Sequence, residues 1–176
     1  FNSHVNETIK INDWIKSYKN QLLAMKEEIL ENNISFRYLN TLFFGGGTPS
    51  LMPLKIIESI IDLSKEMFGF KNDIEITIEA NPSSYDKKKF IEFKKIGINR
   101  LSIGAQSLNN KYLKFLGRLH GIQDVKTSLN EASEIFENIS VDLIYAFHGQ
   151  KIHDWTNELE NFLNTYNLQH LSLYQL

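Results

Sequence analysis

The chain has 176 residues, of which 42% are hydrophobic and 23% are charged, and these values are typical of one globular domain with a sizeable core. Its 19 basic and 21 acidic residues give a formal net charge of −2, which offers no electrostatic basis for binding nucleic acid or an anionic membrane surface. Because no apolar stretch approaches the ~20 residues of a membrane span and no signal peptide is visible, the sequence predicts a cytoplasmic protein.

Cysteine is absent from the sequence, so disulfides and thiolate chemistry are excluded for these 176 residues. A metal ion would need histidine and carboxylate ligands, and the five histidines show no ligand spacing, so no metal site is predicted. The chain opens on Phe1 and ends inside an apolar run at Leu176. A parallel strand needs neighbours and cover on both faces, so we expect the sequence to be truncated at both ends.

Apolar periodicity predicts alternating helices and strands along the chain. Helical spacing is expected at 12–32, 54–68, 86–96, 122–136 and 154–166, with Gly97 ending the third helix and Asp154 capping the fifth. Short buried runs predict strands at 39–44, 75–80, 100–105, 139–147 and 170–175. This alternation indicates an α/β fold of parallel strands with right-handed crossovers, either a doubly wound sheet or a barrel-like (β/α) array. No linker or repeat divides residues 1–176, so one domain is expected.

Polar and glycine residues follow the predicted strands at their carboxyl ends, which form the functional face of a parallel β/α array. The glycine run at 45–47 could be only a tight turn, or its N–H groups could bind a carboxylate or phosphate. Glu79 and Asp142 lie inside buried runs, where an acid costs several kcal/mol unless it is paired or bound to a ligand. An internal ion pair of Glu79 with Arg100 or Arg118 is the purely structural alternative. The two acids otherwise indicate a site for hydroxyl or amino groups.

Five segments occur in a distinctive order: TLFFGGGTPS at 41–50, IEANP at 78–82, NRLSIGAQS at 99–107, LGRLH at 116–120 and VDLIYA at 141–146. Together they resemble the radical S-adenosylmethionine (SAM) proteins of the oxygen-independent coproporphyrinogen III oxidase-like family, which includes a heme chaperone branch. The segments FNSH at 1–4 and LSLYQL at 171–176 are similar to the heme chaperone branch.

The resemblance implies a partial (β/α) barrel and a SAM site. It implies that Gly46, Gly47 and Thr48 contact the amino and carboxylate end of SAM, and that Glu79 binds its ribose hydroxyls. Further residues of the cofactor pocket implied by the resemblance are Gln106, Arg118 and Asp142. It also implies a role in porphyrin or heme metabolism, with porphyrin or heme as a small-molecule partner.

In this family a Cys-x-x-x-Cys-x-x-Cys loop just before the FNSH segment holds a 4Fe-4S cluster, and the cluster needs thiolates. The loop and the first barrel strand are therefore expected upstream of Phe1, and a C-terminal region downstream of Leu176. The resemblance implies an oxidoreductase-like enzyme, whereas the lack of cysteine predicts that this chain alone performs no radical chemistry. A non-catalytic heme-trafficking protein and a remnant of a split gene are the alternatives.

Overall fold

The computed structural model describes residues 10–35 and 38–176, so the FNSH segment at 1–4 lies outside the described residues. The strands are β1 (Leu39–Phe44), β2 (Phe70–Ala80), β3 (Arg100–Gln106), β4 (Asn138–Tyr145) and β5 (His170–Gln175). The helices are α1 (Ile11–Glu31), α2 (Leu54–Phe68), α3 (Lys87–Lys95), α4 (Asn110–Phe115), α5 (Ile122–Ser133) and α6 (Ile152–Thr165), with short 3-10 turns at Pro49–Leu51 and Pro82–Ser84.

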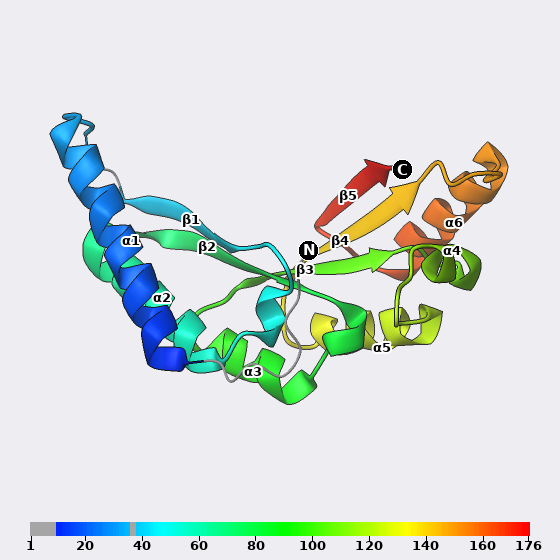
Figure 1. Ribbon diagram of the computed structural model, residues 1–176. Coiled ribbons are helices and arrows are strands. Elements are labelled where there is room, and N and C mark those ends of the chain that lie inside the picture. Colours follow the sequence, from blue (N-terminus) through cyan, green and yellow to red (C-terminus); the bar gives the residue numbers. More distant parts are fainter. Residues whose placement is uncertain (1–9, 36–37) are drawn as a thin grey trace.

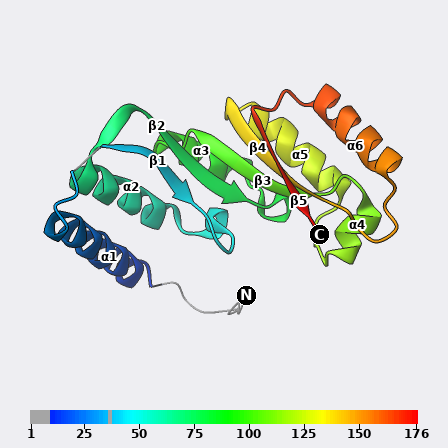
Figure 2. The same cartoon turned by 90° about the horizontal axis from the view of Figure 1, so that it is seen from above.

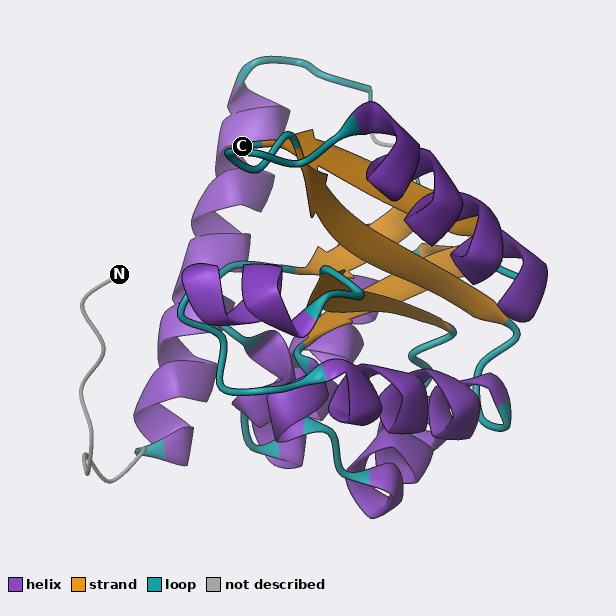
Figure 3. Cartoon of the chain, turned by 90° about the vertical axis from the view of Figure 1, so that its right-hand side faces the viewer, coloured by secondary structure: helices purple, strands orange, loops and turns teal. Residues whose placement is uncertain are grey.

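All five strands pair in parallel in the order β1-β2-β3-β4-β5. A doubly wound sheet requires the strand order to reverse at a switch point, and no reversal occurs here. Sequential order with right-handed crossovers places the helices on one side of a curved sheet, as Figures 1, 2 and 3 show. The two arrangements left open by the sequence are thereby resolved, and the predicted partial (β/α) barrel is confirmed.

The outer face of the sheet, which meets the helices, carries the hydrophobic core. Alternate residues of the three central strands point this way because side chains in a strand alternate between faces. Ile78, Leu101 and Val141 are each fully buried at 0% exposure. They belong to one core cluster with apolar residues of α2, α3 and α5, among them Ile56, Ile57, Ile60, Phe90, Phe93, Val125 and Leu129.

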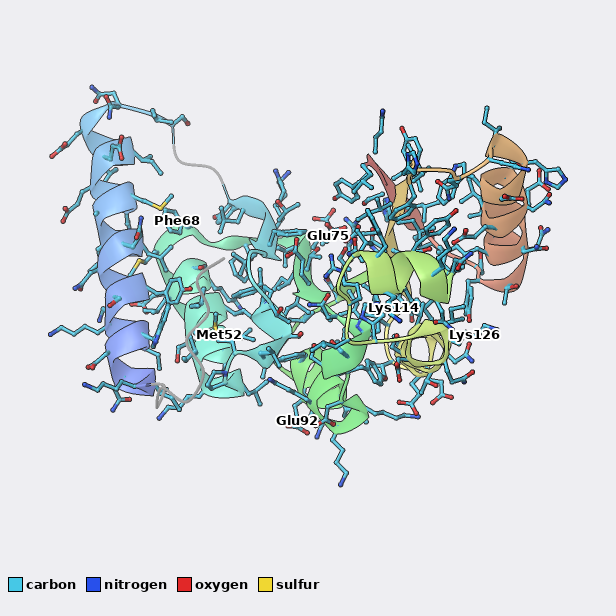
Figure 4. All side chains as sticks on the ribbon, turned by 45° about the vertical axis from the view of Figure 1, so that its right-hand side comes forward. Met52, Phe68, Glu75, Glu92, Lys114 and Lys126 are labelled. Carbon is cyan, nitrogen blue, oxygen red and sulfur yellow. The ribbon has the colours of Figure 1, made fainter. Side chains whose placement is uncertain are left out.

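The inner face of the same strands is polar. Where β3 and β4 begin, the Arg100 Nη1 donates to Glu75 Oε1 at 2.9 Å, and the Asn138 Nδ2 contacts Glu75 Oε2 at 3.5 Å. Figure 4 shows Glu75 on the side of the sheet away from α3 and its labelled Glu92. Further along the strands the inner positions are Glu79, Ser102 and Asp142. One set of strands therefore presents a core to the helices and a polar surface to the open side.

Several predicted element bounds are wrong in detail. Helix α6 begins at Ile152 with Lys151 as its N-cap, so Asp154 lies in the first turn and is not the cap. An acid in the first turn still interacts favourably with the helix dipole. Strand β2 begins five residues earlier than predicted, at Phe70, where it pairs with Leu39 before a register shift. Helix α4 was not predicted at all. Gly97 does follow α3 with a φ of +105°.

Among the residues that the structure describes, no helix is both long and apolar enough to cross a lipid bilayer.

Candidate functional site

A cleft of about 430 Å³ opens at the carboxyl ends of β1 to β4. Its volume lies in the range of sites for small molecules. The lining residues are Gly47, Thr48, Glu79, Ala80, Asn81, Ser102, Gly104, Gln106, Arg118 and Asp142. Six of the seven site residues expected from the sequence are in that set, and the seventh, Gly46, is hydrogen-bonded to one of them. The fold thus brings together residues that are spread over nearly 100 positions of the sequence.

Two hydrogen bonds join the glycine loop after β1 to the end of β2. The Gly46 N–H donates to Glu79 Oε2 at 3.1 Å, and the Asn81 Nδ2 donates to Thr48 Oγ1 at 3.1 Å. Gly46 has a φ of +105°, a backbone conformation that residues with a Cβ rarely adopt. The loop conformation therefore depends both on a glycine at this position and on the carboxylate that accepts its amide.

Glu79 does not form the ion pair considered as its structural alternative. Arg100 pairs with Glu75 instead, and among the described residues no ion pair involves Glu79. Burial raises the pKa of Glu79 above its ordinary value, the Gly46 hydrogen bond lowers it in part, and the charge of Asp142 raises it further. This carboxylate is thus partly desolvated and lacks a cationic partner in this part of the chain.

Asp142 is the second acid of the cleft. The Ser102 Oγ donates to its Oδ2 at 3.4 Å, and the Ser172 hydroxyl also bonds to it. Burial raises the pKa of Asp142, against the lowering effects of the two serine hydroxyls and of the Arg100 charge. Two partly buried acids that repel each other at one cleft favour a ligand with hydroxyl, amino or cationic groups.

Gly104, a residue of β3, lines the cleft. A Cβ at this position would lie 2.7 Å from the Gln106 Nε2 and 3.2 Å from the Asn81 Oδ1. The two amides can therefore approach the β3 backbone only because residue 104 has no side chain. Gln106 itself has a φ of +69°, which is uncommon outside glycine and is often found at functional sites.

Sequence reasoning missed Ser102 and Gly104 as site residues. The signal that could have found them is the period of two along β3, which puts Arg100, Ser102, Gly104 and Gln106 on one face. Serine and glycine are weak strand formers, so they do not stand out in an apolar run. Within residues 10–35 and 38–176, no cluster of three or more His, Cys, Asp or Glu side chains is suited to hold a metal ion.

The chain is similar to one protein family and to several known proteins. The radical SAM superfamily matches residues 3–161. Heme chaperone HemW of Escherichia coli (strain K12) is 32% identical over 181 aligned positions, which cover 100% of this chain and 46% of the relative. Heme chaperone HemW of Buchnera aphidicola subsp. Acyrthosiphon pisum (strain APS) is 38% identical over 143 residues, which cover 81% of this chain and 38% of the relative.

Among solved structures, the radical SAM enzyme coproporphyrinogen III oxidase (HemN) from Escherichia coli superposes with a TM-score of 0.77 at 25% identity. The superposition covers 94% of this chain and 37% of that protein. An archaeal Elp3 from Methanocaldococcus infernus, at 18% identity and a TM-score of 0.69, shares the fold. The chain spans less than half the length of each of these similar proteins.

Proposed function

This chain belongs to the radical SAM superfamily, and from that premise we propose that its cleft binds S-adenosylmethionine in a protein of porphyrin or heme metabolism. The observation that carries the proposal is the convergence of the glycine loop, Glu79, Arg118 and Asp142 on one cleft of about 430 Å³. Neither the loop nor the acids alone would distinguish a ligand site from ordinary turns and ion pairs.

The groups that line the cleft suit the chemistry of SAM. Its amino-acid end carries a carboxylate and an ammonium group, for which we assign the Arg118 guanidinium, the backbone of Gly46 and Gly47, and Thr48. Its ribose hydroxyls are donors, and we assign them to Glu79 Oε1, since Oε2 already accepts the Gly46 N–H. Glu79 therefore has two proposed roles, to hold the glycine loop and to bind the ligand. Gln106 and Asp142 complete the proposed binding set.

SAM bound in such a protein supplies a radical once an electron cleaves it. These residues bind and orient the cofactor in our proposal, and they do not supply that electron. A 4Fe-4S cluster is held by thiolates, and the 176 residues contain no cysteine. The residues of this chain therefore do not fit a 4Fe-4S cluster.

The similarity to proteins named heme chaperones supports the heme-related part of the proposal and the heme chaperone branch over the oxidases. Non-catalytic heme trafficking is a second candidate function, favoured by the same names. A heme titration followed by absorbance and a SAM titration followed by calorimetry together distinguish the two. A saturable spectral shift without SAM binding supports trafficking, whereas SAM binding supports the first proposal.

Replacement of Glu79 tests the SAM site. We expect Glu79→Ala to weaken SAM binding by about 10- to 100-fold, because a charge-assisted hydrogen bond and the hold on Gly46 are both lost. Isothermal titration calorimetry measures the change. Glu92→Ala is the matched control, since Glu92 is an exposed acid of α3 that pairs with Lys95 on the far side of the sheet. Equal affinities for wild type and Glu79→Ala, or no SAM binding by the wild type, would count against the proposal.

A further inference from the structure

The chain makes a strained turn at the carboxyl end of β3. The Ser107 N–H donates to the Ala105 carbonyl at 2.9 Å, across Gln106 with its φ of +69°. This is a γ-turn with a positive central φ, a rare and strained conformation. Glu158 of α6 supports its far side, because its Oε1 accepts the Leu108 N–H at 2.8 Å. The turn determines where the Gln106 side chain enters the cleft.

His120 contacts the same carbonyl. Its Nε2 lies 3.2 Å from the Ala105 oxygen, so the imidazole donates an Nε2–H to a carbonyl that also accepts from Ser107. The side chain is buried at 5% exposure, whereas its neighbour Leu119 is 95% exposed. Burial lowers the pKa of His120, and the positive charge of Arg118 lowers it further, against the raising effects of the Ala105 hydrogen bond and of Asp124. The buried ring is thus held as a neutral donor.

His120 and Arg118 both lie on the segment between α4 and α5, and each end of this segment is hydrogen-bonded to the adjacent helix. The Arg118 N–H donates to the Leu113 carbonyl of α4 at 2.9 Å. At the other end the Gly121 N–H donates to Asp124 Oδ2 of α5 at 2.8 Å. His120 lies between these two attachments and connects the middle of the segment with the end of β3. Arg118, two residues before it, then lines the cleft.

We propose that His120 is a positioning residue of the cleft, whose buried imidazole fixes Gln106 and Arg118 relative to one another through the Ala105 carbonyl. The two cleft residues come from different elements, the end of β3 and the segment between α4 and α5. One hydrogen bond therefore joins the strained turn to the segment with the guanidinium. The functional meaning of this coupling rests on the proposed SAM site, whereas the coupling itself can be measured without any ligand.

Amide hydrogen exchange followed by NMR tests the coupling on the ligand-free chain. His120→Phe keeps the ring volume and removes the donor, and His120→Gln keeps a donor amide near the Nε2 position. We expect His120→Phe to speed exchange of both the Ser107 and Arg118 amides by about five- to tenfold, as the loss of one hydrogen bond implies, and His120→Gln to restore both. His153→Ala, an exposed histidine of α6, is the control that should change neither rate.

Amides in the centre of β4 report whether each variant keeps its fold, and their exchange should not change. If His120→Phe leaves both amides unaffected, changes only one of them, or changes both while His120→Gln fails to restore them, the coupling is wrong. A SAM titration of the same variants provides the second readout. We expect about tenfold weaker binding for His120→Phe and near wild-type binding for His120→Gln. Absence of SAM binding by the wild type would reject the proposed function, and the exchange rates would still decide the role of His120.

Discussion

Strands β2, β3 and β4 have two faces that differ sharply in chemistry. On the outer face Ile78, Leu101 and Val141 are completely buried against helices, and their burial stabilises the fold. On the inner face the neighbouring residues Glu79, Ser102 and Asp142 line an open cleft. A shift of one residue along a strand separates a core position from a site position. Core packing and the lining of the cleft therefore fall on alternate residues of the same strands.

The inner face also lowers stability where the outer face raises it. The pKa values of Glu79 and Asp142 are both raised, mainly by burial, so their ionised forms are less favourable in the folded chain than in the unfolded chain. A surface that holds partly buried acids is costly unless a ligand engages them. Replacing an acid of the inner face and replacing a core residue of the outer face should therefore change stability in opposite directions.

The largest expected effect is on the outer face. Leu101→Ala removes a fully buried side chain from the core and should lower the free energy of unfolding by about 3 kcal/mol, measured by urea denaturation. The adjacent inner-face replacement Ser102→Ala is the matched control and should cost less than about 1 kcal/mol. Similar losses for the two variants would contradict the division between the faces.

Asp142→Asn should have the opposite sign. Removing a carboxylate whose pKa is raised should increase the free energy of unfolding at neutral pH by roughly 1 kcal/mol, while it weakens SAM binding. The stabilising contribution of protonated Asp142 is fully present below its ordinary pKa of 3.8 and is lost as pH rises through the raised folded-state value. The advantage of the variant should therefore grow with pH across this window. A constant difference between pH 3 and pH 8 would argue against the assignment.

The smallest stability effect is expected for Gly104→Ala. The new Cβ would approach the ends of two flexible amides, at 2.7 Å from Gln106 Nε2 and 3.2 Å from Asn81 Oδ1, and these ends can move. The free energy of unfolding should change by less than about 1 kcal/mol, because alanine also removes the entropic cost of glycine in a strand. SAM affinity should fall all the same, since both amides leave their places in the cleft. Unaltered affinity by calorimetry would exclude Gly104 as a determinant of the cleft's shape.

Much of the fold could be predicted from the sequence, because long apolar patterns such as that of α2 and the β-branched run before Ala80 are strong signals. Helix α4 has only six residues, too few for a helical period to show. The grouping of Glu79, Gln106 and Asp142 could be expected, since parallel strands place their carboxyl ends at one edge. The partners of these side chains could not be predicted, because the choice of Arg100 for Glu75 over Glu79 depends on strand register.

The bond between Gly46 and Glu79 also bears on the time course of folding. It joins residues 33 positions apart, and the Ser102–Asp142 bond joins residues 40 positions apart, so neither can form before the intervening helices have brought the strands together. Closing such loops costs chain entropy, and non-local contacts of this kind form slowly. The cleft should therefore appear only when the central strands have paired. In a stopped-flow refolding experiment, competence to bind ligand should lag behind the early helical signal and report the completion of the sheet.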